Sequence, residues 1–143
     1  MNAESNCEGV SILVPDVSSN SIGAATMLGK MLQPHYPVQI IGPDMGGGIN
    51  EMYRGDFNYT VILAPRIYRL PEYIYDCHRI MKQATGRVLI AVKAYANTIV
   101  PALWLKRFHH REMVVYLDEW DSAIYHSLPA GRQFKERLKN LHH

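Results

Sequence analysis

Three carboxylates stand close together near the C-terminal end of the chain, directly after a short apolar stretch. Residues 113–117 carry only apolar and aromatic side chains, and Asp118, Glu119 and Asp121 follow them around Trp120. A stretch without polar alternation predicts a strand covered on both faces, and ligands of parallel sheets bind beyond the carboxyl ends of the strands. Crowded carboxylates can raise one another's pKa and accept hydrogen bonds from sugar hydroxyls. The three are therefore candidate catalytic residues, with solvated caps of the next helix as the alternative.

A second polar loop follows the first predicted strand. Residues 10–14 are largely apolar and lead through this loop into a helical pattern, and the candidate substrate-binding residues here are Ser18, Ser19, Asn20, Ser21 and Gly23. Backbone N–H groups at a helix N-terminus can bind a phosphate or a substrate hydroxyl. Ordinary capping of the helix would use the same residue types, so both interpretations stay open.

Basic and aromatic side chains form the third group of candidates. Arg66 and Lys93 lie close to the predicted carboxyl ends of two other strands, and Tyr95 follows Lys93 by two residues. Cations at this edge can steer an anionic donor or a phosphorylated lipid towards the site, so the three are candidate substrate-binding residues; solvated surface positions are the alternative. His109 and His110 have no third ligand nearby, so no metal site is expected. The sequence predicts chemistry without a metal or a cofactor.

Strand and helix patterns alternate along the whole chain and must position these candidates. The predicted strands cover residues 10–15, 38–42, 60–64, 87–92 and 113–117. The predicted helices cover residues 21–33, a segment from Pro71 to a cap at Gly86, a segment with Thr98 as its N-cap, and residues 130–141. This alternation predicts a single α/β domain over residues 1–143. We expect a three-layer Rossmann-like fold with a mostly parallel sheet of five or more strands and helices on both faces.

Composition excludes several classes of protein. The chain has 143 residues, a formal net charge of +2, 48% hydrophobic and 20% charged residues, which is typical of one soluble globular domain. The small charge gives no indication of nucleic-acid binding, and Cys7 and Cys77 are not expected to form a disulfide. Because the chain lacks an apolar run of about 18 residues, we expect neither a signal peptide nor a membrane span, and we predict a cytoplasmic location.

The signatures of three families with related folds are absent from the loops where they belong. A dinucleotide-binding domain carries G-x-G-x-x-G after its first strand, but residues 16–23 contain one glycine. Residues 46–48 are three glycines without a lysine behind them, which excludes a P-loop. A receiver domain needs an acceptor aspartate at the end of the third strand, where this chain has residues 64–66, Ala-Pro-Arg.

The order of elements, the second strand with its turn at residues 38–43 and the junction at residues 115–121 resemble a known family. The chain is similar to the N-terminal domain of GT-B type glycosyltransferases, in particular bacterial sugar transferases of the large retaining group. Residues 115–121 look like the junction in which a hydrophobic strand runs into D-x-D-D-W. In this chain residues 18–21 replace the family's common Gly-Gly pair, and the histidine often found after the fourth or fifth strand is absent.

The resemblance implies a function. GT-B enzymes use two Rossmann-like domains to transfer a sugar from a nucleotide-diphosphate donor to a glycan or lipid-linked acceptor. Residues 1–143 would be the acceptor-side domain, a missing C-terminal domain would bind the nucleotide sugar, and the isolated chain would be inactive. A lipid-linked acceptor would bring the protein into peripheral contact with a membrane. The alternative is a non-catalytic flavodoxin-like binding or interaction module, which a stop codon after residue 143 in the native gene would favour.

Overall fold

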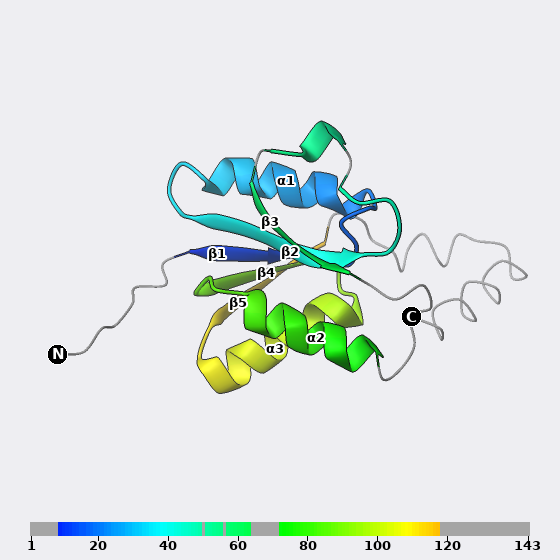
Figure 1. Ribbon diagram of the computed structural model, residues 1–143. Helices are drawn as coiled ribbons and strands as arrows, with labels where there is room; N and C mark the ends of the chain where they lie inside the picture. Colours follow the sequence, from blue (N-terminus) through cyan, green and yellow to red (C-terminus); the bar gives the residue numbers. More distant parts are fainter. Residues whose placement is uncertain (1–8, 50, 56, 64–71, 118–143) are drawn as a thin grey trace, which may run out of the picture.

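The computed structural model describes residues 9–49, 51–55, 57–63 and 72–117 of the chain, and these form a layered α/β domain (Figure 1). Within them, one sheet contains the strands β1 (Val10–Leu13), β2 (Val38–Asp44), β3 (Asn58–Leu63), β4 (Val88–Val92) and β5 (Glu112–Tyr116). All neighbouring strands are parallel, in the order β3-β2-β1-β4-β5. The helices are α1 (Ser21–Leu32), α2 (Glu72–Gln83), α3 (Ala96–His109) and the short 3-10 helix η1 (Glu51–Tyr53).

The predicted fold class is confirmed. Figure 1 shows α1 on one face of the sheet and α2 with α3 on the other, so the domain has three layers. The strand order is that of a Rossmann fold and differs from the flavodoxin-like order 2-1-3-4-5. The flavodoxin-like arrangement considered for the non-catalytic alternative is therefore wrong, and that alternative reduces to a Rossmann-like binding module.

Two hydrophobic cores lie on the two faces of the sheet. Because successive residues of a strand point to opposite faces, Ile12 packs into the core beneath α1 while Leu13 packs into the core beneath α2 and α3. The helical stripes predicted from the sequence supply the other halves of these cores. Ile22 of α1 is buried in the first core, and Ile80 and Leu105 of α2 and α3 are buried in the second.

The prediction that residues 113–117 form a strand covered on both faces is wrong. In the part of the chain that the structure describes, β5 pairs with β4 alone and forms an edge of the sheet. Val114 remains 51% exposed and Val115 42% exposed. Both edge strands and doubly covered central strands carry β-branched residues, so an apolar run by itself does not separate them.

The third long helix starts earlier than predicted. Thr98 was expected to be its N-cap, but α3 begins at Ala96, and Thr98 lies buried in the first turn. The Thr98 hydroxyl donates to the carbonyl oxygens of Lys93 and Tyr95, each at 2.9 Å. A threonine that bonds back to the preceding chain has the same sequence signature as a cap. The predicted helix over residues 130–141 lies outside the described residues.

The sequence predicts that Gly86 caps α2. This prediction is wrong, because the helix ends at Gln83. Gly86 lies against β1, where its N–H donates to the Ser11 hydroxyl at 2.8 Å. A Cβ atom on Gly86 would come within 2.5 Å of the Ser11 nitrogen and 2.7 Å of the Gly9 carbonyl oxygen. The position therefore needs glycine because two backbone segments approach each other closely.

A buried carboxylate in α2 makes the stability of the domain depend on pH. Asp76 is 2% exposed, its Oδ1 lies 3.7 Å from a guanidinium nitrogen of Arg79, and its Oδ2 has no hydrogen-bond partner among the described residues. Burial raises the pKa of Asp76, and the attraction of Arg79 opposes this rise only in part. The folded protein thus holds this proton to a higher pH than the unfolded chain does. The contribution of Asp76 to stability is greatest below the ordinary aspartate pKa and is lost as the pH rises through the folded pKa.

We expect the Asp76→Asn variant to be more stable than the parent protein at pH 7, because the amide carries no charge to bury. The difference in the free energy of unfolding should shrink to zero as the pH falls below the ordinary aspartate pKa. Urea unfolding between acid and neutral pH measures this difference. Glu112→Gln, at an exposed carboxylate, is the matched control for the loss of one negative charge. A less stable Asp76→Asn variant at pH 7 would mean that the ion pair with Arg79 outweighs the cost of burial.

Candidate functional site

The strand order places one preferred ligand-binding position at the carboxyl edge of the sheet. From β1 the chain proceeds to β2 and β3 on one side, and β4 and β5 lie on the other side. The topological switch point therefore falls between β1 and β4, and ligands of open α/β sheets bind in the crevice at such a point. Residues 14–20, after β1, and residues 93–95, after β4, border it. Two groups of candidates from the sequence lie on these two loops.

Asp16 organises the loop after β1. Its Oδ1 accepts hydrogen bonds from the Ser18 N–H at 2.9 Å, the Ser18 hydroxyl at 2.6 Å and the Met45 N–H at 3.2 Å. The last of these bonds ties the loop after β1 to the loop after β2. Sequence reasoning did not include Asp16 among the site residues, although an aspartate two residues before a serine is a recognisable signal for an Asx turn.

The loop after β4 forms the other side of the crevice. Lys93 has a φ of 62°, a left-handed conformation that costs energy for a residue with a Cβ atom. Its N–H donates to the Tyr116 carbonyl of β5 at 2.8 Å, and the side chain of Tyr95 is exposed. Asn97, which the sequence analysis did not single out, donates from Nδ2 to the Pro15 carbonyl at 2.7 Å. This bond fixes the first turn of α3 to the loop after β1 across the switch point.

Ser19, just before α1, forms hydrogen bonds within its own loop and to the start of the helix. Ser19 Oγ accepts the Ser21 N–H at 3.3 Å and donates to the Asp16 carbonyl at 2.9 Å, and the N-cap residue Asn20 makes no side-chain cap. Ser21 is buried, whereas Asn20 is exposed. The sequence left two interpretations of these residues open, ligand binding and helix capping. Ser19 supports capping in part, because its hydroxyl accepts a backbone N–H at the start of α1. Among these residues, Asn20 is the most exposed to a ligand in solution, and Ser19 is half-buried.

Gly23 contacts a different part of the fold. A Cβ atom at this position would lie 3.0 Å from the Tyr53 hydroxyl, so the glycine lets η1 approach α1. Gly23 also borders a groove of about 410 Å³ between α1 and η1, together with Tyr53 and Met27. Close packing explains this glycine without a ligand.

Two carboxylates lie at the carboxyl edge of the sheet, in the loop after β1 and at the end of β2. Asp44, at the end of β2, accepts hydrogen bonds from the N–H groups of Gly46 and Gly48 at 3.0 and 3.1 Å. Asp16 accepts the hydrogen bonds from Ser18 and Met45 described above. Lys93 contributes one cation on the opposite side. The Asp16 carboxylate, in the loop that leads into α1, opposes the binding of a phosphate at the start of this helix and favours a neutral ligand rich in hydroxyl groups.

The candidate catalytic residues Asp118, Glu119 and Asp121, and the candidate Arg66, lie outside the described residues. Leu117 is the last described residue after β5, and the carboxylates follow it directly. Because β5 is parallel to β1 and β4, it ends at the same edge as the crevice. The catalytic roles of Asp118, Glu119 and Asp121 and the binding role of Arg66 therefore stay predictions.

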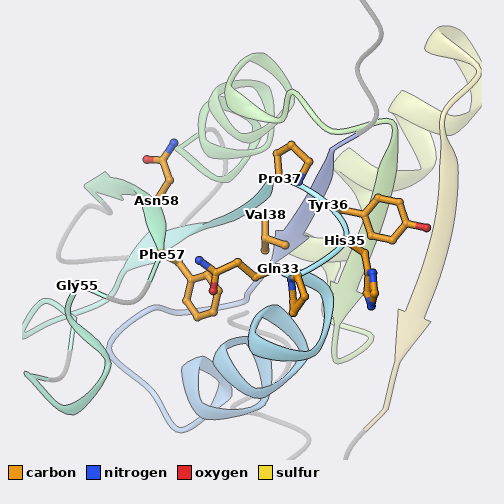
Figure 2. Close-up of a pocket in the computed structure, with 9 residues that line it drawn as sticks. Gln33, His35, Tyr36, Pro37, Val38, Gly55, Phe57 and Asn58 are labelled. Atoms are coloured by element: carbon orange, nitrogen blue, oxygen red, sulfur yellow. The ribbon is translucent and has the colours of Figure 1, made fainter.

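A broader hollow opens at the opposite edge of the sheet. It has a volume of about 570 Å³ and lies between the connection from α1 to β2 and the turn before β3. Figure 2 shows Phe57 beside Val38, with the rings of His35 and Tyr36 directed away from them. The hollow is shallow and lies at the amino ends of the strands, where parallel sheets seldom bind ligands. We therefore prefer the crevice at the switch point as the candidate site.

Further properties limit what the described residues can do. They contain no group of three or more histidine, cysteine, aspartate or glutamate side chains placed to hold a metal ion. None of the described helices combines the length and apolar character needed to cross a membrane.

Comparison of the chain with protein-family models, with curated proteins and with solved structures finds no match. Arguments about function therefore come from the site itself.

Proposed function

We propose that this domain binds the acceptor in a GT-B type glycosyltransferase, which transfers a sugar from a nucleotide-diphosphate donor to a glycan or lipid-linked acceptor. The observation that carries the proposal is the topological switch point between β1 and β4, where Asn97 in the first turn of α3 donates a hydrogen bond to the Pro15 carbonyl after β1. Hydrogen bonding within and between the loops fixes their shape before a ligand arrives. Such preorganisation lowers the cost of binding.

The chemistry of the rim suits a sugar. Asp16 and Asp44 offer carboxylate oxygens to ligand hydroxyls, Asn20 offers an amide, and the exposed ring of Tyr95 offers an apolar face for a sugar ring. The Asp16 carboxylate disfavours the donor diphosphate at the start of α1, which supports a donor site on another domain. The resemblance implies that Ser19, Asn20 and Ser21 face the donor phosphates across the cleft between the two domains, but the Ser19 hydroxyl is already engaged within its own loop.

Titration of the isotope-labelled chain with chitobiose, maltose and UDP-glucose, followed by amide NMR spectra, tests the proposal. We expect one or both neutral disaccharides to shift the amide signals of Ser18, Asn20, Lys93 and Tyr95, with millimolar affinity for such short acceptors. Micromolar binding of UDP-glucose would show that the donor site lies in this domain. Shifts confined to His35 and Tyr36 would move the site to the opposite edge. The absence of disaccharide-induced shifts would favour a non-catalytic module that binds something other than sugars.

A pair of glycine substitutions separates the binding role of Lys93 from its backbone strain. Lys93 and His110 both adopt left-handed conformations, with φ of 62° and 51°, but His110 ends α3 at the opposite edge of the sheet. We expect Lys93→Gly and His110→Gly each to raise the free energy of unfolding by up to about 1 kcal/mol, because glycine accepts this conformation without strain. Lys93→Gly alone should weaken disaccharide binding, by roughly tenfold if one charge-assisted contact is lost. Equal affinities in the two variants would remove Lys93 from the site.

A further inference from the structure

The outward face of α3 carries an apolar stripe that the described fold does not cover. Thr98, Ala102 and Leu105 point into the core and are buried. On the opposite side of the helix, the spacing of three to four residues brings together a set of exposed apolar side chains that we call the α3 stripe: Val100, Leu103, Trp104 and Phe108. Helices at the surface of a soluble domain usually present polar residues on this side. The helix is thus apolar on two faces, and the core explains one of them.

Two aromatic rings dominate the α3 stripe. Trp104 is 50% exposed and Phe108 57% exposed, and their ring centroids are 4.5 Å apart. The guanidinium of Arg107 lies 5.6 Å from the centre of the Phe108 ring. The rings therefore form one continuous apolar surface with a cation at its margin. Large exposed apolar patches bordered by polar groups mark sites of interaction.

The charges of α3 itself are of one sign. Lys106 and Arg107 lie in the last turn of α3, and the helix carries no acidic residue. Cations at the end of a helix are favoured by its dipole, which accounts for the charges but not for Trp104 and Phe108. Helices that lie in the headgroup region of a membrane carry tryptophan, phenylalanine and leucine on the face that enters the lipid and lysine and arginine on the adjoining polar face.

We infer that the outward face of α3 docks on a membrane surface rich in anionic phospholipid. The aromatic side chains would enter the boundary between headgroups and acyl chains, and Lys106 and Arg107 would contact the lipid phosphates. A second copy of the chain is a poorer partner, because the same stripe would offer no carboxylate to these cations. In Figure 1, α3 lies on the side of the sheet opposite α1, so docking through α3 leaves α1 away from the membrane. The inference depends on α3 alone and not on the proposed sugar transfer.

Vesicle co-sedimentation of the full chain tests the inference. We expect binding to vesicles of phosphatidylcholine mixed with phosphatidylglycerol, weaker binding as the ionic strength rises, and no binding to pure phosphatidylcholine. Trp104→Ala combined with Phe108→Ala should lower the partition coefficient by about tenfold or more, because the apolar contact is lost. Lys106→Gln combined with Arg107→Gln should lower it by about tenfold and reduce its dependence on salt.

Matched changes on the other side of the sheet provide the control. Lys30 and Met31 are exposed neighbours on α1, and Met31 is 66% exposed. Lys30→Gln combined with Met31→Ala removes one cation and one apolar side chain and should leave vesicle binding unchanged. Circular dichroism checks that each variant is folded. Equal losses in the α1 and α3 variants, or no binding to anionic vesicles at low salt, would overturn the inference. So would a dimer in sedimentation that only the Trp104 and Phe108 changes dissociate, without vesicle binding, since the partner would then be a second copy.

Discussion

Replacing Gly86 by alanine is expected to destabilise the domain by about 3 kcal/mol, at the upper end of the range for overpacked interiors. The new Cβ atom would meet the Ser11 nitrogen at 2.5 Å and the Gly9 carbonyl oxygen at 2.7 Å. Both are backbone atoms at the start of β1, which pairs with β2 and β4 in the middle of the sheet. A side chain could rotate away, but β1 can move only by disturbing its hydrogen bonds to both neighbours. The substitution therefore destabilises the pairing of β1 with β2 and β4 in the middle of the sheet.

Gly55→Ala is the control for this prediction. Gly55 has a φ of 91°, and its added Cβ atom would meet no heavy atom within 4 Å. This substitution introduces backbone strain without a clash and should cost about 1 kcal/mol. Urea unfolding measures both variants, and the Gly86→Ala protein should also melt roughly 10 °C below the parent. If the two variants lose the same stability, the close approach of Gly86 to β1 is not the reason for glycine at this position.

The fold class was predictable because each element carries its own periodic signal. The apolar spacing in α1 and α2 identified buried residues such as Ile22 and Ile80, and these pack into the cores as expected. The errors arose where two structures share one local signal. Val114 and Val115 have the same pattern in an edge strand as in a central one, and the strand order that distinguishes them depends on contacts distant in sequence.

The candidate site was predictable in position but not in detail. Polar residues after strands indicated the carboxyl edge, and both sides of the crevice were selected in this way. The hydrogen bond from Asn97 to Pro15 joins residues that are 82 positions apart, so no local pattern contains it. The close packing of Gly23 against Tyr53 likewise depends on the position of η1. Residue type therefore located the loops, while the tertiary fold decided which side chains remain accessible to a ligand.

The end of β5 has a defined relation to the switch point. Strands in a sheet are about 4.8 Å apart, so the end of β5 lies roughly 10 Å from the end of β1, across β4. Under the proposed function, the catalytic role predicted for Asp118 and Asp121 is to orient an acceptor hydroxyl or to stabilise charge that develops as the donor sugar departs.

If the domain acts in a two-domain glycosyltransferase as proposed, Asp118→Asn and Asp121→Asn should each lower the turnover of that enzyme by about a hundredfold or more. Asparagine keeps the shape of the side chain and loses the charge and basicity, so the melting temperature should hardly change. Glu112→Gln is the matched control, because Glu112 is an exposed carboxylate at the other end of β5 and should leave turnover unaltered. Initial rates and thermal melts of the three variants separate the explanations. A loss of stability with full specific activity would mean that Asp118 and Asp121 cap a helix, and the catalytic role proposed for them would then be wrong.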